Sequence, residues 1–394
     1  MPMKFRLHAL LLVTTLAAAA CDRGPRTVAP LEVDGRLPAP LPLVVERPAL
    51  LPELPAGSGA FLNKGDKTLV EDPVCYVTRP ASIEYWSKGW SEHPDGQFKV
   101  RTNSHGMRED LDPLAAEPDL RVLVAGDSHT DGVVNNAESF PNILEARLAE
   151  RWPDGSIEVL NAGVGSTSFP MYLGTLVKFL ALEPDVFVCT VYSGNDFGYM
   201  VHAVAKIRQE PIERADAPYF ERLAQANALP QPAAAAVNQL YNQRWRWAYR
   251  PQDVEPSMEL SLDYTREMAR LCEQRGVRFI VLHLPSADAV EVERWAPLCK
   301  RLDEVFGFDA EQAGLADRFT DRYLETLRGE GIEVLDGRVP LRQAAAAGVS
   351  PLYWSRDLHL GVEGHRILGE ALCAAIPGPP DQAPAPPAGA PPGW

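Results

Sequence analysis

A short apolar run at residues 120–125, LRVLVA, ends directly in the turn sequence GDSHT at residues 126–130. A run of this length next to a glycine is typical of a strand that is buried on both faces of a parallel sheet. Ligands of open α/β sheets bind at the carboxyl edge of such strands. The sequence therefore predicts that Ser128 lies at this edge, where it is a candidate nucleophile.

From residue 121 onward, apolar runs alternate with stretches of helical periodicity. Such alternation predicts parallel strands whose connecting helices cover both faces of one sheet. We therefore expect an α/β fold. The strands are expected at residues 121–125, 157–160, 186–192, 277–284 and 332–335, and the helices at residues 139–151, 171–182, 258–275, 310–328 and 361–375.

The start of the chain has the composition of an export signal. Residues 1–20 begin with basic side chains, continue with an apolar run and end in four alanines, an order typical of a secretory signal peptide. The apolar run is too short to span a bilayer as a stable helix. The segment LAAAAC resembles the lipobox of bacterial lipoproteins, in which Cys21 carries the lipid, although Ala18 replaces the usual leucine. The alternative is an ordinary signal peptide followed by a chance cysteine.

Composition divides the rest of the chain into further parts. Residues 21–65 are rich in proline and are expected to form an extended tether that builds no core. Residues 66–118 are expected to be a lead-in that packs on the main domain, which spans residues 119–376. An insertion at about residues 200–256, rich in alanine, proline and charge, would cover the sheet edge as a lid. Residues 377–394 repeat the composition of the tether and are expected to be disordered.

The chain carries 38 Lys and Arg against 53 Asp and Glu, a net charge of −15, and so acidic a chain is a poor nucleic-acid binder. The segment RWRWAYR at residues 244–250 is a basic exception. It predicts either a patch that contacts sugars or a membrane, or an amphipathic helix whose aromatic side chains face inward and whose arginines face water. Five cysteines follow Cys21 at irregular spacings without a CxxC pair, so no zinc site is expected.

A serine hydroxyl is a weak nucleophile unless a base, a group that orients the base and donors for the oxyanion lie nearby. The segment Asp357-Leu358-His359 offers the base and its partner. In extended backbone, residues two apart point to the same side, so Asp357 would hold one imidazole nitrogen of His359 while the other faces Ser128. The alternative is an aspartate that caps the last helix, beside a surface histidine.

Donors for the oxyanion are expected at the ends of the second and third strands. The sequence NAGVGST at residues 161–167 ends the second strand, and its glycines would let a backbone N–H approach a substrate closely. Asn195 follows the third strand and would present its amide at the same edge. The alternatives are a plain tight turn and a capping asparagine. Gly163 also opens a weak match to a dinucleotide fingerprint, in which Ser168 replaces the third glycine.

Together, these segments resemble the sequence blocks of the SGNH, or GDSL-type, hydrolase family, over about residues 102–376. The resemblance implies a flavodoxin-like three-layer α/β/α sandwich around a central parallel sheet. GDSHT at 126–130 is similar to the first block, GVG at 163–165 to the second, GND at 194–196 to the third and DLH at 357–359 to the last, while NSHGMR at 103–108 resembles the lead-in of many bacterial members.

The resemblance also implies a role for each site residue. Ser128 is the expected nucleophile, His359 the base, and Asp357 the acid that orients the base. Gly165 and Asn195, together with the N–H of Ser128, are the expected oxyanion donors. The mechanism implied by the family needs no metal and no cofactor.

Two departures from the family pattern affect these assignments. The last block is one residue shorter than the usual Asp-x-x-His. His365 is a nearby alternative to His359 as the base, but it is expected to be a polar surface residue of the last helix. The second block is one residue short after Asn161, which favours Gly165 over Gly163 or Ser166. Of the remaining candidates, Asp127 is expected to fix the turn, His129 to line the pocket, and His105 and His283 to be hydrogen-bonded structural residues.

The implied function is that of an extracytoplasmic serine esterase that hydrolyses or transfers an acyl ester through an acyl-enzyme at Ser128. Its expected partner is an ester-bearing small molecule or an acylated polysaccharide, such as an acetylated surface carbohydrate. The expected location is the bacterial cell envelope, with the lipid on Cys21 as the membrane anchor. The alternatives are a polysaccharide O-acetyltransferase and, in another class, a non-catalytic glycan-binding lipoprotein.

Overall fold

The structure is a computed structural model of the 394-residue chain, and it describes residues 25–29, 35–62, 67–88, 92–211, 217–230 and 232–377. The expected signal peptide, the expected lipidation site Cys21 and residues 378–394 of the expected tail lie outside the described residues. No helix within the described ranges is long and apolar enough to cross a membrane.

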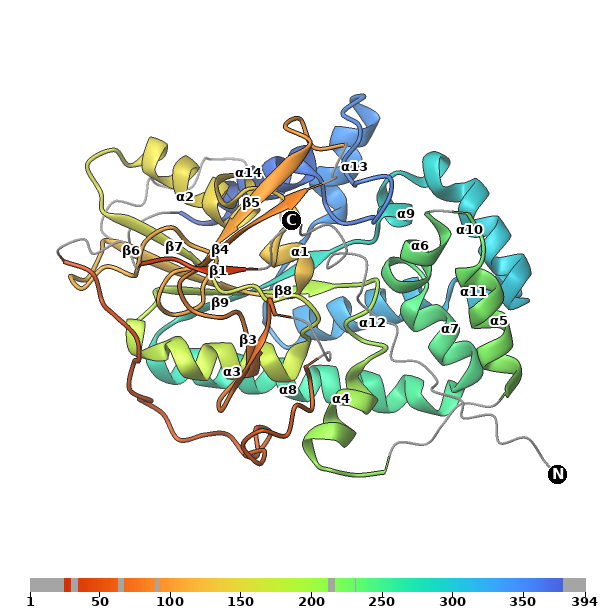
Figure 1. The fold of residues 1–394 in the computed structure, drawn as a ribbon, viewed down its shortest axis with the longest axis horizontal. Coiled ribbons are helices and arrows are strands. Elements are labelled where there is room, and N and C mark those ends of the chain that lie inside the picture. Colours follow the sequence, from red (N-terminus) through yellow and green to blue (C-terminus); the bar gives the residue numbers. More distant parts are fainter. Residues whose placement is uncertain are drawn as a thin grey trace.

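The centre of the molecule is a five-stranded parallel sheet in the order β10-β9-β8-β6-β7 (Figure 1). Every residue of β6 and β8 is buried. Strands buried in this way need helices on both faces, as the alternation in the sequence predicts. The α/β fold class is confirmed. The strands are β6 (Leu120–Ala125), β7 (Ile157–Asn161), β8 (Val186–Tyr192), β9 (Arg278–Leu284) and β10 (Glu333–Asp336).

Helices cover both faces of the sheet and complete three layers, with α2 and α14 above it and α3 and α8 below it in Figure 1. Side chains alternate along β6, so Leu123 joins the core on one face and Val122 and Val124 join the core on the other. The first core includes α3 (Phe169–Phe179), α8 (Val254–Arg275) and α12 (Leu315–Gly329), and the second includes α2 (Phe140–Arg151), α9 (Ala287–Val290), α10 (Val292–Phe306), α13 (Arg338–Ala346) and α14 (Val362–Ala375).

Several helices differ in length from the expected ones. Helix α8 begins four residues before the expected start at residue 258. The helix expected at 310–328 is divided at Gly314 into α11 (Ala310–Ala313) and α12. Helix α3 ends at Phe179, where the 3-10 helix η3 (Leu180–Leu182) continues the chain.

The described residues of the lead-in contribute strands to two small antiparallel sheets, one of which also includes β1 from the tether. One pairs β2 (Val70–Asp72) with β3 (Tyr76–Thr78), and the other has the order β1-β4-β5. The backbone N–H of Lys99 in β5 donates to the side chain of Asn135 at 2.8 Å, which attaches this sheet to the main domain. The three strands are β1 (Arg26–Thr27), β4 (Ile83–Lys88) and β5 (Gln97–Arg101), and the 3-10 helix η2 (Asn136–Glu138) follows Asn135.

Part of the proline-rich stretch packs on the main domain. Leu51 is fully buried within the first core, and the backbone carbonyl of Leu50 accepts a hydrogen bond from the hydroxyl of Tyr264 at 2.8 Å. The expectation that the tether builds no core is therefore wrong for the described residues 35–62. Apolar side chains placed between the prolines provide the contact surface that proline itself does not.

The described residues of the insertion form helices α4 to α7, which lie beside the carboxyl end of the sheet (Figure 1). In α7 the side chains of Trp245 and Trp247 are buried, as the amphipathic-helix interpretation predicts. The expectation that its arginines face water is wrong for Arg244, which is buried and pairs with Asp288 at 2.8 Å. The helices are α4 (Met200–Ile207), α5 (Ala217–Asn227), α6 (Ala233–Gln239) and α7 (Asn242–Tyr249), followed by the 3-10 helix η4 (Pro251–Asp253).

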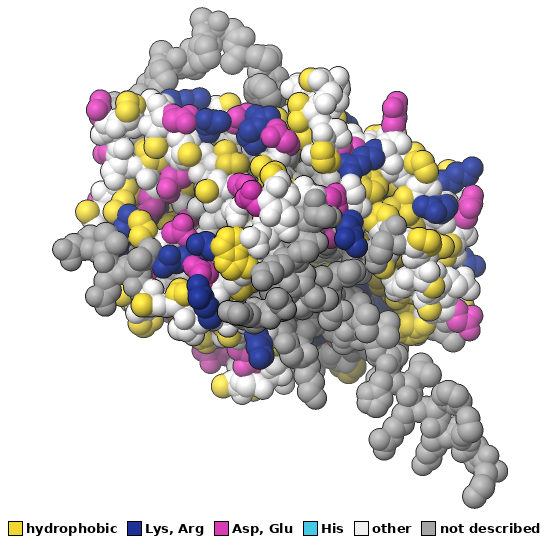
Figure 2. Space-filling view, turned by 45° about the horizontal axis from the view of Figure 1, so that its top comes forward, with side chains coloured by type: hydrophobic (Ala, Val, Ile, Leu, Met, Phe, Trp, Pro, Cys, Tyr) yellow, Lys and Arg dark blue, Asp and Glu magenta, His cyan; other side chains and the backbone are white. Residues whose placement is uncertain are grey.

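Charged side chains of both signs are scattered over the face of the molecule that Figure 2 presents. The net charge of −15 is thus not gathered into one acidic patch on that face. The described cysteines, Cys75, Cys189, Cys272, Cys299 and Cys373, are all free thiols.

Candidate active site

Ser128 is the first residue of the short helix α1 (Ser128–Asp131), directly after β6. Asp127 caps this helix, because its side chain accepts a hydrogen bond from the backbone N–H of His129 at 2.9 Å. A side chain at Gly126 would collide with Thr130, so the tight approach of the turn to the helix requires glycine. Burial raises the pKa of Asp127 to about 6, although the bond from His129 opposes this. The turn leaves Ser128 partly exposed between buried neighbours.

The imidazole of His359 faces Ser128, with 2.8 Å between Nε2 and the serine Oγ. On the other side of the ring, Nδ1 lies 3.0 Å from Oδ2 of Asp357. The second oxygen of Asp357, Oδ1, accepts the backbone N–H of His359 at 3.1 Å. The structure thus brings the three residues expected to act together into one continuous hydrogen-bonded chain.

The backbone between Asp357 and His359 is not extended, and this part of the expectation is wrong. Leu358 has a left-handed φ of 62°, and Asp357 ends a turn. The shorter Asp-x-His spacing therefore reaches the required geometry through a turn, in which one carboxylate binds both the backbone and the ring of the residue two positions later. The buried side chain of Leu358 anchors this uncommon conformation.

The loop that carries Asp357 and His359 is held by contacts with the lead-in and with the segment that follows α1. The carboxylate of Glu92 accepts the backbone N–H groups of Ser355 and Arg356. The indole N–H of Trp354 donates to the backbone carbonyl of Val133 at 3.1 Å. Sequence reasoning missed Glu92, because nothing in its local sequence marks a contact 264 positions away.

Burial disfavours the charged form of His359, but the adjacent Asp357 carboxylate outweighs it and raises the pKa of His359 above its ordinary value. The side chains of His359 and Asp357 are only 13% and 14% exposed, so water screens their attraction weakly. A positively charged imidazole is therefore stabilised at this position, as a base needs after it has taken a proton.

The expected oxyanion donors follow β7 and β8, the two strands that pair with β6. Gly165 is next to the serine, since a Cβ on Gly165 would lie 3.7 Å from the Cβ of Ser128. A Cβ on Gly163 would instead collide with the backbone of α1. Asn195 lies, half-buried, in the turn after β8, the strand that pairs with β6.

Two buried arginines bind helix α1 and the turn that follows it, and only Arg108 belongs to a segment that the sequence singled out. Arg108 donates to the backbone carbonyls of Asp131, Gly132 and Val134. Arg79 forms a bidentate ion pair with the Asp131 carboxylate, with its Nε 2.7 Å from Oδ1. Together they hold the segment that starts at the nucleophile.

Among the described residues, His359 is the histidine that hydrogen-bonds to the hydroxyl of Ser128. His365 is fully buried and accepts the backbone N–H of Phe140 at 3.2 Å, so the expectation that it is surface is wrong. His105 bonds to the carbonyl of Leu37 and His283 to Asp336, in line with structural roles. His129 is buried against Tyr192 with 3.8 Å between ring centroids, and it lies beside His359 rather than at an open surface.

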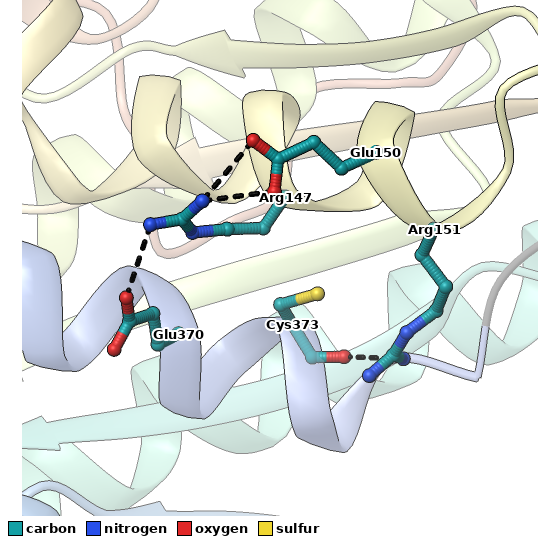
Figure 3. Close-up of a pocket in the computed structure, with 5 residues that line it drawn as sticks. All are labelled: Arg147, Glu150, Arg151, Glu370 and Cys373. Carbon is teal, nitrogen blue, oxygen red and sulfur yellow. Dashed lines mark hydrogen bonds and ion pairs between the residues drawn. The ribbon is translucent and has the colours of Figure 1, made fainter.

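A separate surface pocket lies between α2 and α14 and is lined by Arg147, Glu150, Arg151, Glu370 and Cys373 (Figure 3). Both helices run back from the carboxyl edge of the sheet, so the pocket near their carboxyl ends is remote from Ser128. Its arginines are bound to Glu150, Glu370 and the carbonyl of Cys373. Within the described residues, no group of three or more His, Cys, Asp or Glu side chains is arranged to hold a metal ion.

A serine, a histidine and an aspartate in one hydrogen-bonded chain at the carboxyl edge of a parallel sheet are the arrangement of a serine hydrolase, and the family match makes the chain an ester-acting one. The chain belongs to the GDSL-like lipase/acylhydrolase family, whose model matches residues 124–367, more than half of the sequence. The expected membership of the SGNH, or GDSL-type, family is confirmed.

The solved structures that match the chain have low sequence identity and low TM-scores. A protein of the G-D-S-L family from Desulfitobacterium hafniense is 17% identical, with 65% of this chain and 99% of that chain covered and a TM-score of 0.36. An acetyl xylan esterase is 12% identical, with 65% and 100% covered and a TM-score of 0.39. The acetylxylan esterase of Geobacillus stearothermophilus is 13% identical, with 65% and 93% covered and a TM-score of 0.35. No curated protein matches the chain.

Proposed function

We propose that this chain is an extracytoplasmic serine esterase that cleaves acyl esters through an acyl-enzyme on Ser128. The observation that carries the proposal is the 2.8 Å approach of His359 Nε2 to Ser128 Oγ, with Asp357 on the opposite ring nitrogen. A nucleophile, a base and a group that orients the base are the set that activates serine in enzymes with a Ser-His-Asp triad.

In the first half of the reaction, Ser128 Oγ attacks the ester carbonyl while His359 Nε2 takes the hydroxyl proton. The resulting imidazolium keeps its Nδ1–H bond to Asp357 and then passes the Nε2 proton to the departing alcohol. The N–H groups of Ser128 and Gly165 and the amide of Asn195 stabilise the oxyanion, and one such donor is typically worth about 10²–10³ in rate. In the second half, water gives a proton to His359 Nε2 as its oxygen attacks the acyl carbon. His359 then passes that proton to Ser128 Oγ as the acyl–Oγ bond breaks, which releases the acid and restores the serine hydroxyl.

The proposed substrate class is an acyl ester on a carbohydrate at the cell surface, with acetyl as the acyl group. Support comes from the sequence of residues 1–21, which is typical of an exported lipoprotein with its lipid on Cys21. A protein tethered in this way meets envelope polysaccharides as its nearest polymeric substrates. Mass spectrometry of the mature N-terminus and membrane fractionation of a Cys21→Ala variant test the anchor.

The nucleophile is tested with a fluorophosphonate probe and p-nitrophenyl acetate. The Ser128→Ala variant is expected to lose probe labelling and to lose turnover by at least about 10⁴-fold. Ser156→Ala is the matched control, because Ser156 is exposed just before β7, at the opposite end of the strands from the site. Labelling or turnover that persists in Ser128→Ala would overturn the assignment.

A series of p-nitrophenyl esters of increasing chain length tests the acyl group, and activity confined to acetate supports the carbohydrate proposal. Product partition between water and an added glycan separates hydrolysis from O-acetyl transfer. Tight glycan binding that Ser128→Ala leaves unchanged, with no turnover of any ester, would instead indicate a non-catalytic binding protein.

A further inference from the structure

Gln239, the last residue of α6 in the insertion, reaches the candidate active site with its side chain. Its Oε1 lies 3.3 Å from Nε2 of His129, and its Nε2 lies 3.3 Å from Nε2 of His359. Its backbone carbonyl accepts the hydroxyl of Tyr192 at 2.7 Å. One residue therefore connects the insertion to the candidate base and to the strand that precedes Asn195.

A backbone N–H sets the direction of these hydrogen bonds. The N–H of Leu360 faces Nδ1 of His129 at 3.3 Å, so Nδ1 is the acceptor and Nε2 of His129 carries the proton. Nε2 of His129 then donates to Oε1 of Gln239, which turns the amide NH₂ of Gln239 toward His359. Burial lowers the pKa of His129 well below its ordinary value, so the His129 ring is neutral at the pH values at which His359 acts as a base.

We propose that Gln239 is a positioning residue that holds His359 as a neutral base, and that the insertion thereby completes the active site; this rests on the function proposed above. The NH₂ group donates to the same Nε2 lone pair that takes the proton of Ser128. Once Nε2 is protonated, two donors face each other and the contact is lost. The contact therefore favours the neutral imidazole and opposes the effect of Asp357.

The backbone of the insertion fits this role. The carbonyl of Gln239 closes over Gly194, where any side chain would collide with it. The side chain of Gln243 donates to the carbonyl of Ser193 at 2.6 Å. Helices α6 and α7 thus both contact the turn that carries Asn195. These contacts fix the backbone of Gln239, from which its side chain extends to the site.

Other charged or titratable groups also influence the pKa of His359, so the effect of Gln239 has to be measured with these groups in place. Asp357 comes from the same loop, Asp127 and Asp131 from the β6–α1 turn and helix, His129 from α1, and His365 from α14. The variants below leave all five unchanged.

The experiment compares Gln239→Leu and Gln239→Glu with the wild type, and Gln225→Leu is the control because Gln225 is an exposed glutamine on α5 of the same insertion. In Gln239→Leu the midpoint of the acidic limb in the pH profile of kcat/KM is expected to rise by about 0.5–1 pH unit, and kcat is expected to fall about 3- to 10-fold. In Gln239→Glu a carboxylate oxygen accepts the Nε2 proton of His359, and the limb is expected to move up by about 1 unit or more.

Titration of the His359 imidazole by NMR gives the same shifts without relying on turnover. The role of Gln239 would be overturned if the folded Gln239→Glu variant kept both wild-type midpoints, that of the acidic limb and that of the His359 titration. This holds whatever the effect on kcat. Failure of the wild type to label at Ser128 would instead reject the proposed function, while the NMR titration would still decide the contact with Gln239.

Discussion

Asp357 binds His359 through both oxygens of its carboxylate, one at the backbone N–H at 3.1 Å and one at the ring Nδ1 at 3.0 Å. The ring bond requires a proton on Nδ1, so Nε2 is left as an acceptor toward Ser128. The backbone bond fixes the turn from which the imidazole projects. A single side chain therefore sets the position and the tautomer of the candidate base.

Asp357→Asn is expected to keep the fold but to lower kcat by roughly 10⁴-fold, because an amide NH₂ facing Nδ1 favours the wrong tautomer of His359. The measurement is kcat on p-nitrophenyl acetate, with circular dichroism to verify folding. A loss of less than about tenfold would show that Asp357 does not orient the base.

Activity is expected to fall as the pH is lowered, with a midpoint in kcat/KM above about 6.5, the ordinary value for histidine. Burial alone would lower the pKa of His359, but the Asp357 carboxylate raises it. Because the base acts in its neutral form, the active fraction grows as the pH rises through the raised pKa. A midpoint below 6.5 in the wild type would contradict the dominance of Asp357.

Arg79→Met is expected to lower the free energy of unfolding by about 3 kcal/mol or more, because it leaves the Asp131 carboxylate buried without its bidentate partner. Urea denaturation measures the loss. Arg266→Met is the control, since its pair with Glu330 is 46% and 33% exposed and is expected to contribute about 1 kcal/mol or less. Equal effects of the two changes would be inconsistent with the support of α1 by Arg79.

His365 is expected to make the protein less stable in mild acid. Burial lowers its pKa to about 3, whereas an unfolded histidine has a pKa of about 6.5. Between these values the unfolded state binds more protons, so stability present above pH 6.5 is lost as the pH falls, by up to about 1.4 kcal/mol per unit.

His365→Gln keeps an acceptor for the N–H of Phe140 but does not titrate. The decline in unfolding free energy between pH 7 and pH 5 is therefore expected to be shallower in this variant than in the wild type. Identical slopes would mean that His365 is protonated equally in the folded and unfolded states.

Much of the fold follows from local sequence. The apolar run at 120–125 is a buried strand, because a continuous apolar segment of that length satisfies a sheet covered on both faces. Ser128 follows it directly, so the location of the candidate nucleophile at the carboxyl edge was predictable from a few adjacent residues. His359 was predictable only in combination with that serine and with the family resemblance.

Long-range contacts were not predictable in this way. Gln239 and Glu92 belong to segments without a motif, and each reaches the site through contacts more than 100 positions away in the sequence. His365 looks polar in a helical stretch, but only the packing of α14 against α2 decides that it is buried. Proline content likewise suggested a tether, although Leu51 is part of the core.

The sequence by itself determined the five strands of the main sheet and which serine follows the first of them, because these depend on periodicity and on neighbours a few positions apart. The tertiary structure alone decided which groups surround that serine. Asp357 orients His359 through a left-handed turn at Leu358, and Gln239 approaches from an insertion. Such contacts depend on how elements that are distant in the sequence pack together, and the local sequence does not predict that packing.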